Sequence, residues 1–195
     1  MFDLFKALYG HVHLGMRIRL DTNECQGDRA RTTEWAAGGL DATVIHDTQY
    51  DGAAATVNQP VEIATLYDNA PGFIKVAQAA RADWLDQNRE VAARYCATTL
   101  RAMKALKSDF GLFRAAVDEY VAEPPSEESL SELFALIQRY PFWTEDGGLS
   151  EDGVRFMIDM ATESGVLTRP MSAADVVDRA TLNRAVELAS QPPEQ

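Results

Sequence analysis

The chain is poor in cysteine and in basic residues, and each shortage excludes a class of protein. Its 195 residues include two cysteines, Cys25 and Cys96, and no C-x-x-C pair, which excludes a disulfide framework. One bridge between the two thiols and two free thiols both stay open. Eighteen basic residues stand against 30 acidic ones, for a net charge of −12. So acidic a chain argues against non-specific binding to nucleic acid and against electrostatic adhesion to an anionic membrane.

Long apolar runs and catalytic signatures are also missing. No stretch approaches the roughly 20 apolar residues of a membrane-spanning helix. The N-terminus, MFDLFKALYGHVHLGM, has no basic start, no unbroken apolar stretch and no small-residue cleavage site, so it is not a signal peptide. If Met1 is the genuine start, we expect a cytoplasmic location. There is no phosphate-binding glycine loop, nucleophile elbow or metal-ligand cluster, so we expect no cofactor and no metal.

Residues 1–79 alternate helix-like and strand-like segments. Met16 to Leu20 alternates apolar and basic residues, as a half-buried strand does. Further strands are expected at 42–45 and 61–66, and helices at 2–9, 28–35 and 52–57. Strands that alternate with helices favour a parallel-rich sheet. The predicted fold class is therefore α/β, a parallel-rich sheet flanked by helices, over a first domain of residues 1–79.

Residues 80–190 predict an all-helical extension that packs on this domain. One helix is indicated by Asp83-Trp84-Leu85, and a second starts after Asn88 with one apolar face: Val91, Tyr95, Thr99, Ala102 and Leu106. Later helices are expected to open at Ser126 after Pro124-Pro125, at Ser150, and at a Ser172/Asp175 capping box. The Ser126 helix should bury four residues: Leu130, Leu133, Phe134 and Ile137. Residues 191–195 are expected to be disordered.

The expected sheet predicts where a ligand would bind. Ligands of parallel sheets bind beyond the carboxyl ends of the strands, which here are followed by the loops 21–28, 46–50 and 67–72. Polar side chains in these loops are the candidate ligand-binding residues: Thr22, Asn23, Gln26, His46, Asp47, Thr48, Gln49 and Asn69.

Each chemically suggestive residue also has a plainer interpretation. His46 could donate a hydrogen bond to a ligand or act as a base, or it could bond the backbone of its own loop. Cys25 could be a nucleophile at a helix N-terminus, or an incidental thiol; Cys96 is expected to be buried packing. His11 and His13 could bind a metal or cap a helix. Three aromatic residues are expected in the core or at a lobe junction rather than as platforms for ligand stacking: Trp84, Phe142 and Trp143.

Four stretches resemble the substrate-binding proteins of ABC importers for nitrate, sulfonates, taurine and thiamine-pyrimidine precursors. The first, Glu34 to Ile45 (EWAAGGLDATVI), resembles a second-lobe element of that family. The others are Asn69 to Phe73, which precedes a strand over 73–77; Trp84 to Glu90 (WLDQNRE), where Arg89 replaces the usual proline; and Ser150 to Val154 with Ser164 to Leu167 and Pro170.

The resemblance implies a type II periplasmic-binding lobe and a function. The chain would be a solute-binding protein, or a fragment of one, for sulfonate-, nitrate- or pyrimidine-like compounds. Its implied partners are the small-molecule ligand, an ABC permease, and either a missing first lobe or a second copy in a homodimer. Such proteins are periplasmic or extracytoplasmic. The alternative is an enzyme on the same scaffold, a decarboxylase or desulfinase that uses Cys25 or His46.

Overall fold

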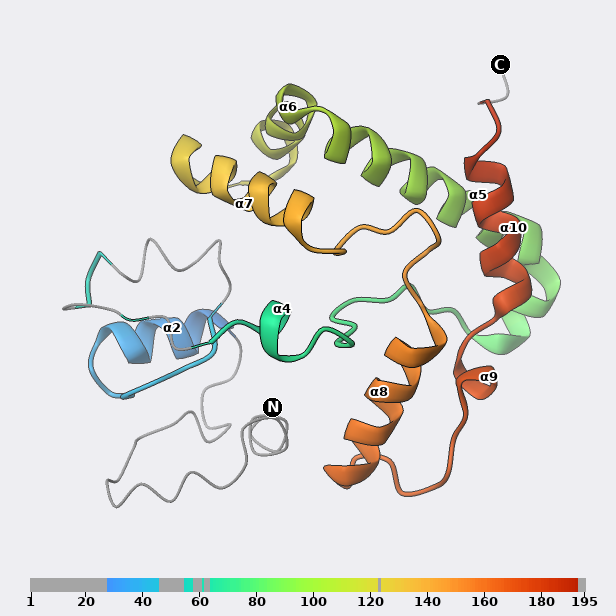
Figure 1. The fold of residues 1–195 in the computed structure, drawn as a ribbon, viewed down its shortest axis with the longest axis horizontal. Helices are drawn as coiled ribbons and strands as arrows, with labels where there is room; N and C mark the ends of the chain where they lie inside the picture. Colours follow the sequence, from blue (N-terminus) through green and yellow to red (C-terminus); the bar gives the residue numbers. More distant parts are fainter. Residues whose placement is uncertain (1–27, 46–54, 58–60, 62–63, 123, 193–195) are drawn as a thin grey trace. The chain divides into compact units, whose positions relative to one another are not determined.

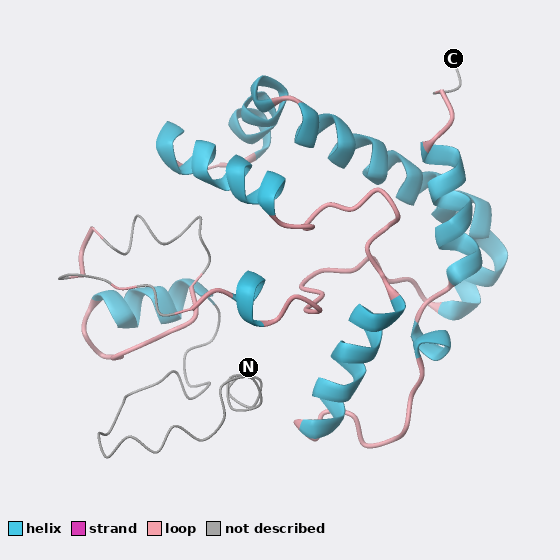
Figure 2. Ribbon diagram, in the orientation of Figure 1, coloured by secondary structure: helices cyan, strands magenta, loops and turns pink. Residues whose placement is uncertain are grey.

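The computed structural model describes residues 28–45, 55–57, 61, 64–122 and 124–192, and Figure 1 traces them. They divide into two compact units, one within 28–71 with 160–168 and the other within 72–159 with 169–192. Over the described ranges the chain is helical, and Figure 2 draws no strand in them. None of the described helices combines the length and the apolar character needed to cross a membrane.

The predicted α/β fold with a parallel-rich sheet is wrong. Of the expected strand 42–45, only Ala42 makes an isolated bridge. The expected strand 61–66 instead leads into α4 (Leu66–Asn69), which begins where the Thr65 hydroxyl accepts a hydrogen bond from the Asp68 N–H at 3.3 Å. Residues 73–77 form no strand, and the expected strand 16–20 lies outside the described residues. Short apolar runs become strands only when a neighbouring strand pairs with them.

The first helix to be described, α2 (Asp28–Ala36), confirms the helix expected over 28–35. It ends before Gly38, whose φ of +77° lies in the left-handed region that glycine adopts without strain. The expected helix 2–9 lies outside the described residues. Of the expected helix 52–57, residues 55–57 form a turn.

The longest helix, α5 (Ala82–Ser108), contains a break at Asn88, where φ is −134° and ψ is 27°. The Asn88 side-chain amide donates to the Trp84 carbonyl at 2.8 Å, which satisfies an acceptor at the break. This confirms the expectation of one helix near Trp84 and another starting after Asn88. The two segments join through a kink rather than a loop.

The face that α5 buries against α10 is not the predicted apolar face, of which Leu106 packs against a different group of buried residues. Ala93 and Ala97 are 0% and 1% exposed and pack against Ala185 of α10 (Arg179–Ala189), whereas Val91 and Tyr95 are 58% and 63% exposed. Figure 1 shows α10 alongside the first half of α5. Alanines at the crossing let two backbones approach more closely than large side chains would.

Charged pairs border this alanine contact. Glu90 of α5 accepts from the Arg184 guanidinium of α10 at 3.3 Å, and Arg89 donates to Asp178 at 2.7 Å. The Arg184 guanidinium lowers the pKa of Glu90 from its ordinary value. The α5–α10 pair therefore combines a small apolar core with ionic links at its edge.

A second cluster joins α5 to α6 (Phe110–Tyr120) and α7 (Glu127–Arg139). Its buried members are Phe113, Leu130 and Ile137, with Leu133 and Phe134 packed against them. The Ser126 hydroxyl accepts from the Ser129 N–H at 3.2 Å and caps α7. Both the cap and the buried stripe of this helix are confirmed.

The remaining helices begin where their capping residues predict. The Ser150 hydroxyl accepts from the Gly153 N–H at 3.1 Å at the start of α8 (Glu151–Glu163), which ends before Gly165 with a φ of +75°. Ser172 donates its backbone N–H to the Asp175 carboxylate at 2.7 Å in front of α9 (Ala173–Val176). These caps confirm the helix starts predicted at Ser150 and Ser172.

Candidate functional site

Most of the ligand-binding residues predicted from the sequence lie outside the described residues: Thr22, Asn23, Gln26, His46, Asp47, Thr48 and Gln49. The same is true of Cys25, His11 and His13. Asn69 is described, and its side-chain amide donates to the Thr65 carbonyl at 2.8 Å inside α4. The Asn69 amide therefore satisfies a local backbone group.

Cys96 has a packing role. Its thiol is partly buried beside the alanine contact of α5 and α10, and it donates to the Gln78 side-chain oxygen at 3.1 Å. Burial raises the pKa of the Cys96 thiol, which favours the unreactive protonated form at neutral pH. The predicted packing role of Cys96 is confirmed.

A groove of about 270 Å³ opens at the C-terminal end of α5, and we call it the Lys107 groove. The second half of α5, the end of α7 and the loop after α7 supply its walls. Its lining residues are Leu100, Met103, Lys104, Lys107, Ser108, Gln138, Trp143, Thr144 and Glu145. All of them belong to the second compact unit.

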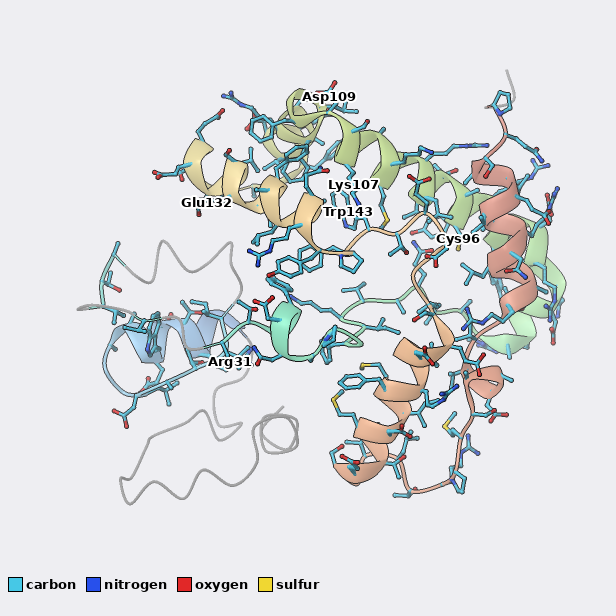
Figure 3. All side chains as sticks on the ribbon, viewed as in Figure 1. Arg31, Cys96, Lys107, Asp109, Glu132 and Trp143 are labelled. Carbon is cyan, nitrogen blue, oxygen red and sulfur yellow. The ribbon has the colours of Figure 1, made fainter. Side chains whose placement is uncertain are left out.

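Two contacts fix the walls of the groove. The Gln138 side-chain amide of α7 donates to the Lys107 carbonyl at 2.7 Å, so it satisfies one of the last carbonyls of α5. Trp143 packs its ring against Phe113, with centroids 6.2 Å apart. Lys107 and Trp143 are labelled in Figure 3, between α5 and α7. The groove is thus held between a helix end and an anchored indole.

The aromatic residues of this region divide between core and surface. Trp143 packs on the second cluster, as predicted for a core residue. Phe142 is more exposed and lies beside Tyr140, with ring centroids 5.8 Å apart. Trp84 is 44% exposed, so it does not lie in a core, and its alternative position at a lobe junction stays a prediction.

The two lysines of the groove differ in their partners. Lys104 Nζ pairs with Glu145 Oε2 at 3.1 Å, and both side chains are well exposed. In the described part of the chain, no carboxylate pairs with the ammonium of Lys107, a residue of intermediate exposure. The neighbouring Asp109 carboxylate instead accepts from the Leu112 N–H at 3.1 Å, as the N-cap of α6. Lys107 is therefore the lysine of the groove that has no carboxylate partner among the described residues.

The loop after α7 orders one side of the groove through Asp146. The Thr144 hydroxyl and the Gly148 N–H both donate to the Asp146 carboxylate, the latter at 2.9 Å, and they lower its pKa from the ordinary value. The Asp146 charge is thereby engaged within its own loop. This leaves Lys104, Lys107 and Glu145 as the ionised side chains that line the groove.

Sequence reasoning missed this groove. Lys104 and Lys107 stand three residues apart on one helix, so they lie on neighbouring positions of its surface. Trp143, which the sequence favours as a packed residue over a stacking platform, follows in the loop after α7. These two signals could have located the groove, but only the contact between α5 and α7 brings them together.

Across the described residues, no three histidine, cysteine, aspartate or glutamate side chains are placed to hold a metal ion. No protein-family model, curated protein or solved structure matches this chain.

Proposed function

We propose that this chain binds small organic anions and that the Lys107 groove is the binding site. The observation that carries the proposal is the Lys107 ammonium, which lines a groove without a carboxylate partner in the described part of the chain. An ammonium in this position attracts a carboxylate or a sulfonate. The sulfonate-like ligand implied by the family resemblance was expected in the loops 21–28, 46–50 and 67–72, so that expectation does not bear on this groove.

The surroundings of Lys107 favour an anion that also carries an apolar ring. Leu100, Met103 and the Trp143 indole supply apolar wall beside the two lysines. At about 270 Å³ the groove is at the small end of ligand sites. A compound of about ten non-hydrogen atoms, such as benzenesulfonate, suits this space. Its expected dissociation constant is about 1 mM, given about 0.4 kcal/mol per atom.

The charge of the whole chain opposes anion binding, but distance limits that opposition. The net charge is −12, yet the Debye length at physiological salt is about 8 Å. Of the charged side chains that line the groove, Lys104, Lys107 and Glu145 together leave one positive charge. The same screening weakens the attraction between the lysines and the anion, so binding should weaken as salt is added.

Titration with benzenesulfonate, followed by nuclear magnetic resonance, tests the proposal. The variant Lys107→Met keeps the aliphatic stem and removes the charge, so it should weaken binding about tenfold. The matched control is Lys75→Met, which removes a lysine outside the groove and should leave binding unchanged. Glu145→Gln should strengthen binding about threefold, because it frees Lys104 from its carboxylate.

Neutral benzyl alcohol serves as the comparison ligand. It should bind more weakly than benzenesulfonate and should not distinguish Lys107→Met from the natural chain. If benzenesulfonate does not bind, or binds the Lys107→Met variant equally well, the groove is not an anion site. Membership of an ABC uptake system and the alternative of an enzyme that uses Cys25 or His46 both stay predictions, and neither enters this proposal.

A further inference from the structure

The side-chain amide of Gln138 presents a hydrogen-bond acceptor at the Lys107 groove. Its nitrogen donates to the Lys107 carbonyl at 2.7 Å. Because only the nitrogen of a carboxamide can donate to a carbonyl, this contact also identifies the other amide atom as the oxygen. Gln138 is exposed and lines the groove, and among the described residues no donor contacts its Oε1. A ligand in the groove therefore meets an open acceptor at Gln138.

Two hydroxyl groups in the lining of the groove have already committed their hydrogens. The Ser108 hydroxyl donates to the Ala105 carbonyl at 2.9 Å, and the Thr144 hydroxyl donates to the Asp146 carboxylate. A hydroxyl has one hydrogen, so each of these oxygens can only accept a further hydrogen bond. Together with Gln138 Oε1, they add neutral acceptors to the lysines of the lining. A ligand that brings only an anion and a ring leaves these acceptors to water.

We propose that the Lys107 groove selects aromatic anions that also carry an uncharged N–H or O–H donor. This inference rests on the anion site proposed above, and it assigns recognition of the donor to Gln138. The Lys107 ammonium pairs with the anionic group, while Gln138 Oε1 accepts a hydrogen bond from the donor. Aminobenzenesulfonates and hydroxybenzenesulfonates have this chemistry.

The anchoring of Gln138 suits a ring with substituents at opposite ends. Its amide is held at the backbone carbonyl of Lys107, whereas the ammonium stands at the far end of a flexible four-carbon stem. The acceptor and the ammonium can therefore be separated by about one lysine side chain, which a para-substituted benzene ring spans. Because the amide nitrogen is already held, Gln138 loses little further freedom when its oxygen binds a ligand.

Nuclear magnetic resonance titration of the natural chain with two matched compounds tests this recognition. The compounds are para-aminobenzenesulfonate and para-toluenesulfonate, which share the anion and the ring and exchange an amine for a methyl group. We expect the amino compound to bind about fivefold more tightly, the effect of one hydrogen bond between neutral groups. The methyl group is the more apolar substituent, so burial against Leu100, Met103 and Trp143 alone would give the opposite order.

The variant Gln138→Met tests the residue. It keeps an unbranched side chain but removes the amide, so the two compounds should bind equally or the methyl compound more tightly. Circular dichroism and the affinity for para-toluenesulfonate show that the fold and the groove are intact in the variant. The matched control is Gln87→Met, which removes an exposed glutamine of α5 outside the groove and should leave the preference unchanged.

A third compound, para-hydroxybenzenesulfonate, tests the donor without any change to the protein. Its O–H donates as an N–H does, so it should share the advantage over para-toluenesulfonate. Failure of all three compounds to bind would refute the anion site and this inference with it. Binding of all three with equal affinity, or a preference for the donors that survives Gln138→Met, would leave the anion site in place and overturn the recognition of a donor by Gln138.

Discussion

Arg101 of α5 closes the C-terminal end of α10 by donating from one guanidinium nitrogen to the carbonyls of Leu188 and Gln191, the latter at 3.1 Å. The last carbonyls of a helix have no partner within the helix, and they carry partial negative charge. A cation from a neighbouring helix satisfies both conditions. Arg101 of α5 thus caps the C-terminal end of α10.

Replacing Arg101 with methionine should therefore destabilise the protein. The variant keeps most of the apolar stem but removes the donor, and we expect a loss of about 1–2 kcal/mol in the free energy of unfolding, since hydrogen bonds from charged donors are the stronger kind. The measurement is urea denaturation followed by circular dichroism. Arg94→Met is the matched control, because exposed Arg94 pairs with Glu90 on its own helix at 3.4 Å and should cost about 0.5 kcal/mol or less. Equal losses in the two variants would show that the cap contributes nothing.

Ala97 should tolerate no larger side chain. It is 1% exposed at the contact of α5 with α10, so Ala97→Leu must push the helices apart. Overpacking of this kind costs about 1–3 kcal/mol. Ala115→Leu makes the same change at an exposed position of α6 and should shift stability by about 0.5 kcal/mol or less. A urea midpoint for Ala97→Leu that matches the natural protein would contradict the alanine-mediated contact.

The fold should lose stability in acid. Thr144 and the Gly148 N–H lower the pKa of Asp146, and Arg184 lowers the pKa of Glu90. A carboxylate with a lowered folded-state pKa stabilises the fold above its unfolded pKa, and this contribution is lost as the pH falls through the folded value. Unfolded carboxyls titrate near about pH 4, so urea midpoints should fall between about pH 5 and pH 3. Asp146→Asn should flatten this decline, whereas Glu132→Gln, which changes an exposed carboxylate on α7, should leave it unaltered.

The features that the sequence predicted correctly depend on local chemistry. Ser126 and Ser150 cap the helices that follow them, and Asn88 marks the kink, because these residues act on backbone groups within four positions. The buried face of α5 could not be predicted in this way. Val91 and Tyr95 are the larger apolar residues, but the fit of Ala93 and Ala97 to Ala185 decides which side is buried.

The predicted strands are wrong, whereas the predicted ligand-binding residues apart from Asn69 lie outside the described residues and stay a prediction. A strand needs a partner from a distant part of the chain, and the described parts of residues 42–45 and 61–66 show none beyond the bridge at Ala42. The expected ligand residues were chosen from the loops of that sheet. The Lys107 groove instead depends on a contact between α5 and the segment that includes Gln138 and Trp143, more than 30 residues away in sequence. No local pattern specifies such a contact.

Replacing a glycine of positive φ with alanine can cost free energy through backbone strain and through steric overlap of the new Cβ. Comparing Gly147 with Gly165 allows the two costs to be measured separately. Their φ angles are similar, +85° and +75°. A Cβ added at Gly165 meets nothing within 4 Å, so Gly165→Ala should cost about 1 kcal/mol from backbone strain alone. A Cβ added at Gly147 would overlap the Cδ1 atom of Leu182, so Gly147→Ala should cost about 1 kcal/mol more.

A double-mutant cycle isolates that overlap. With Leu182→Ala in place, Gly147→Ala should cost no more than Gly165→Ala does, because the overlapping atoms are gone and only the strain is left. Chemical denaturation of the two single variants and the double variant gives the coupling free energy directly. A coupling of zero would mean that the loop after α7 does not pack on Leu182. In that case the loop, which also positions Trp143 and Glu145, would not form a fixed wall of the Lys107 groove.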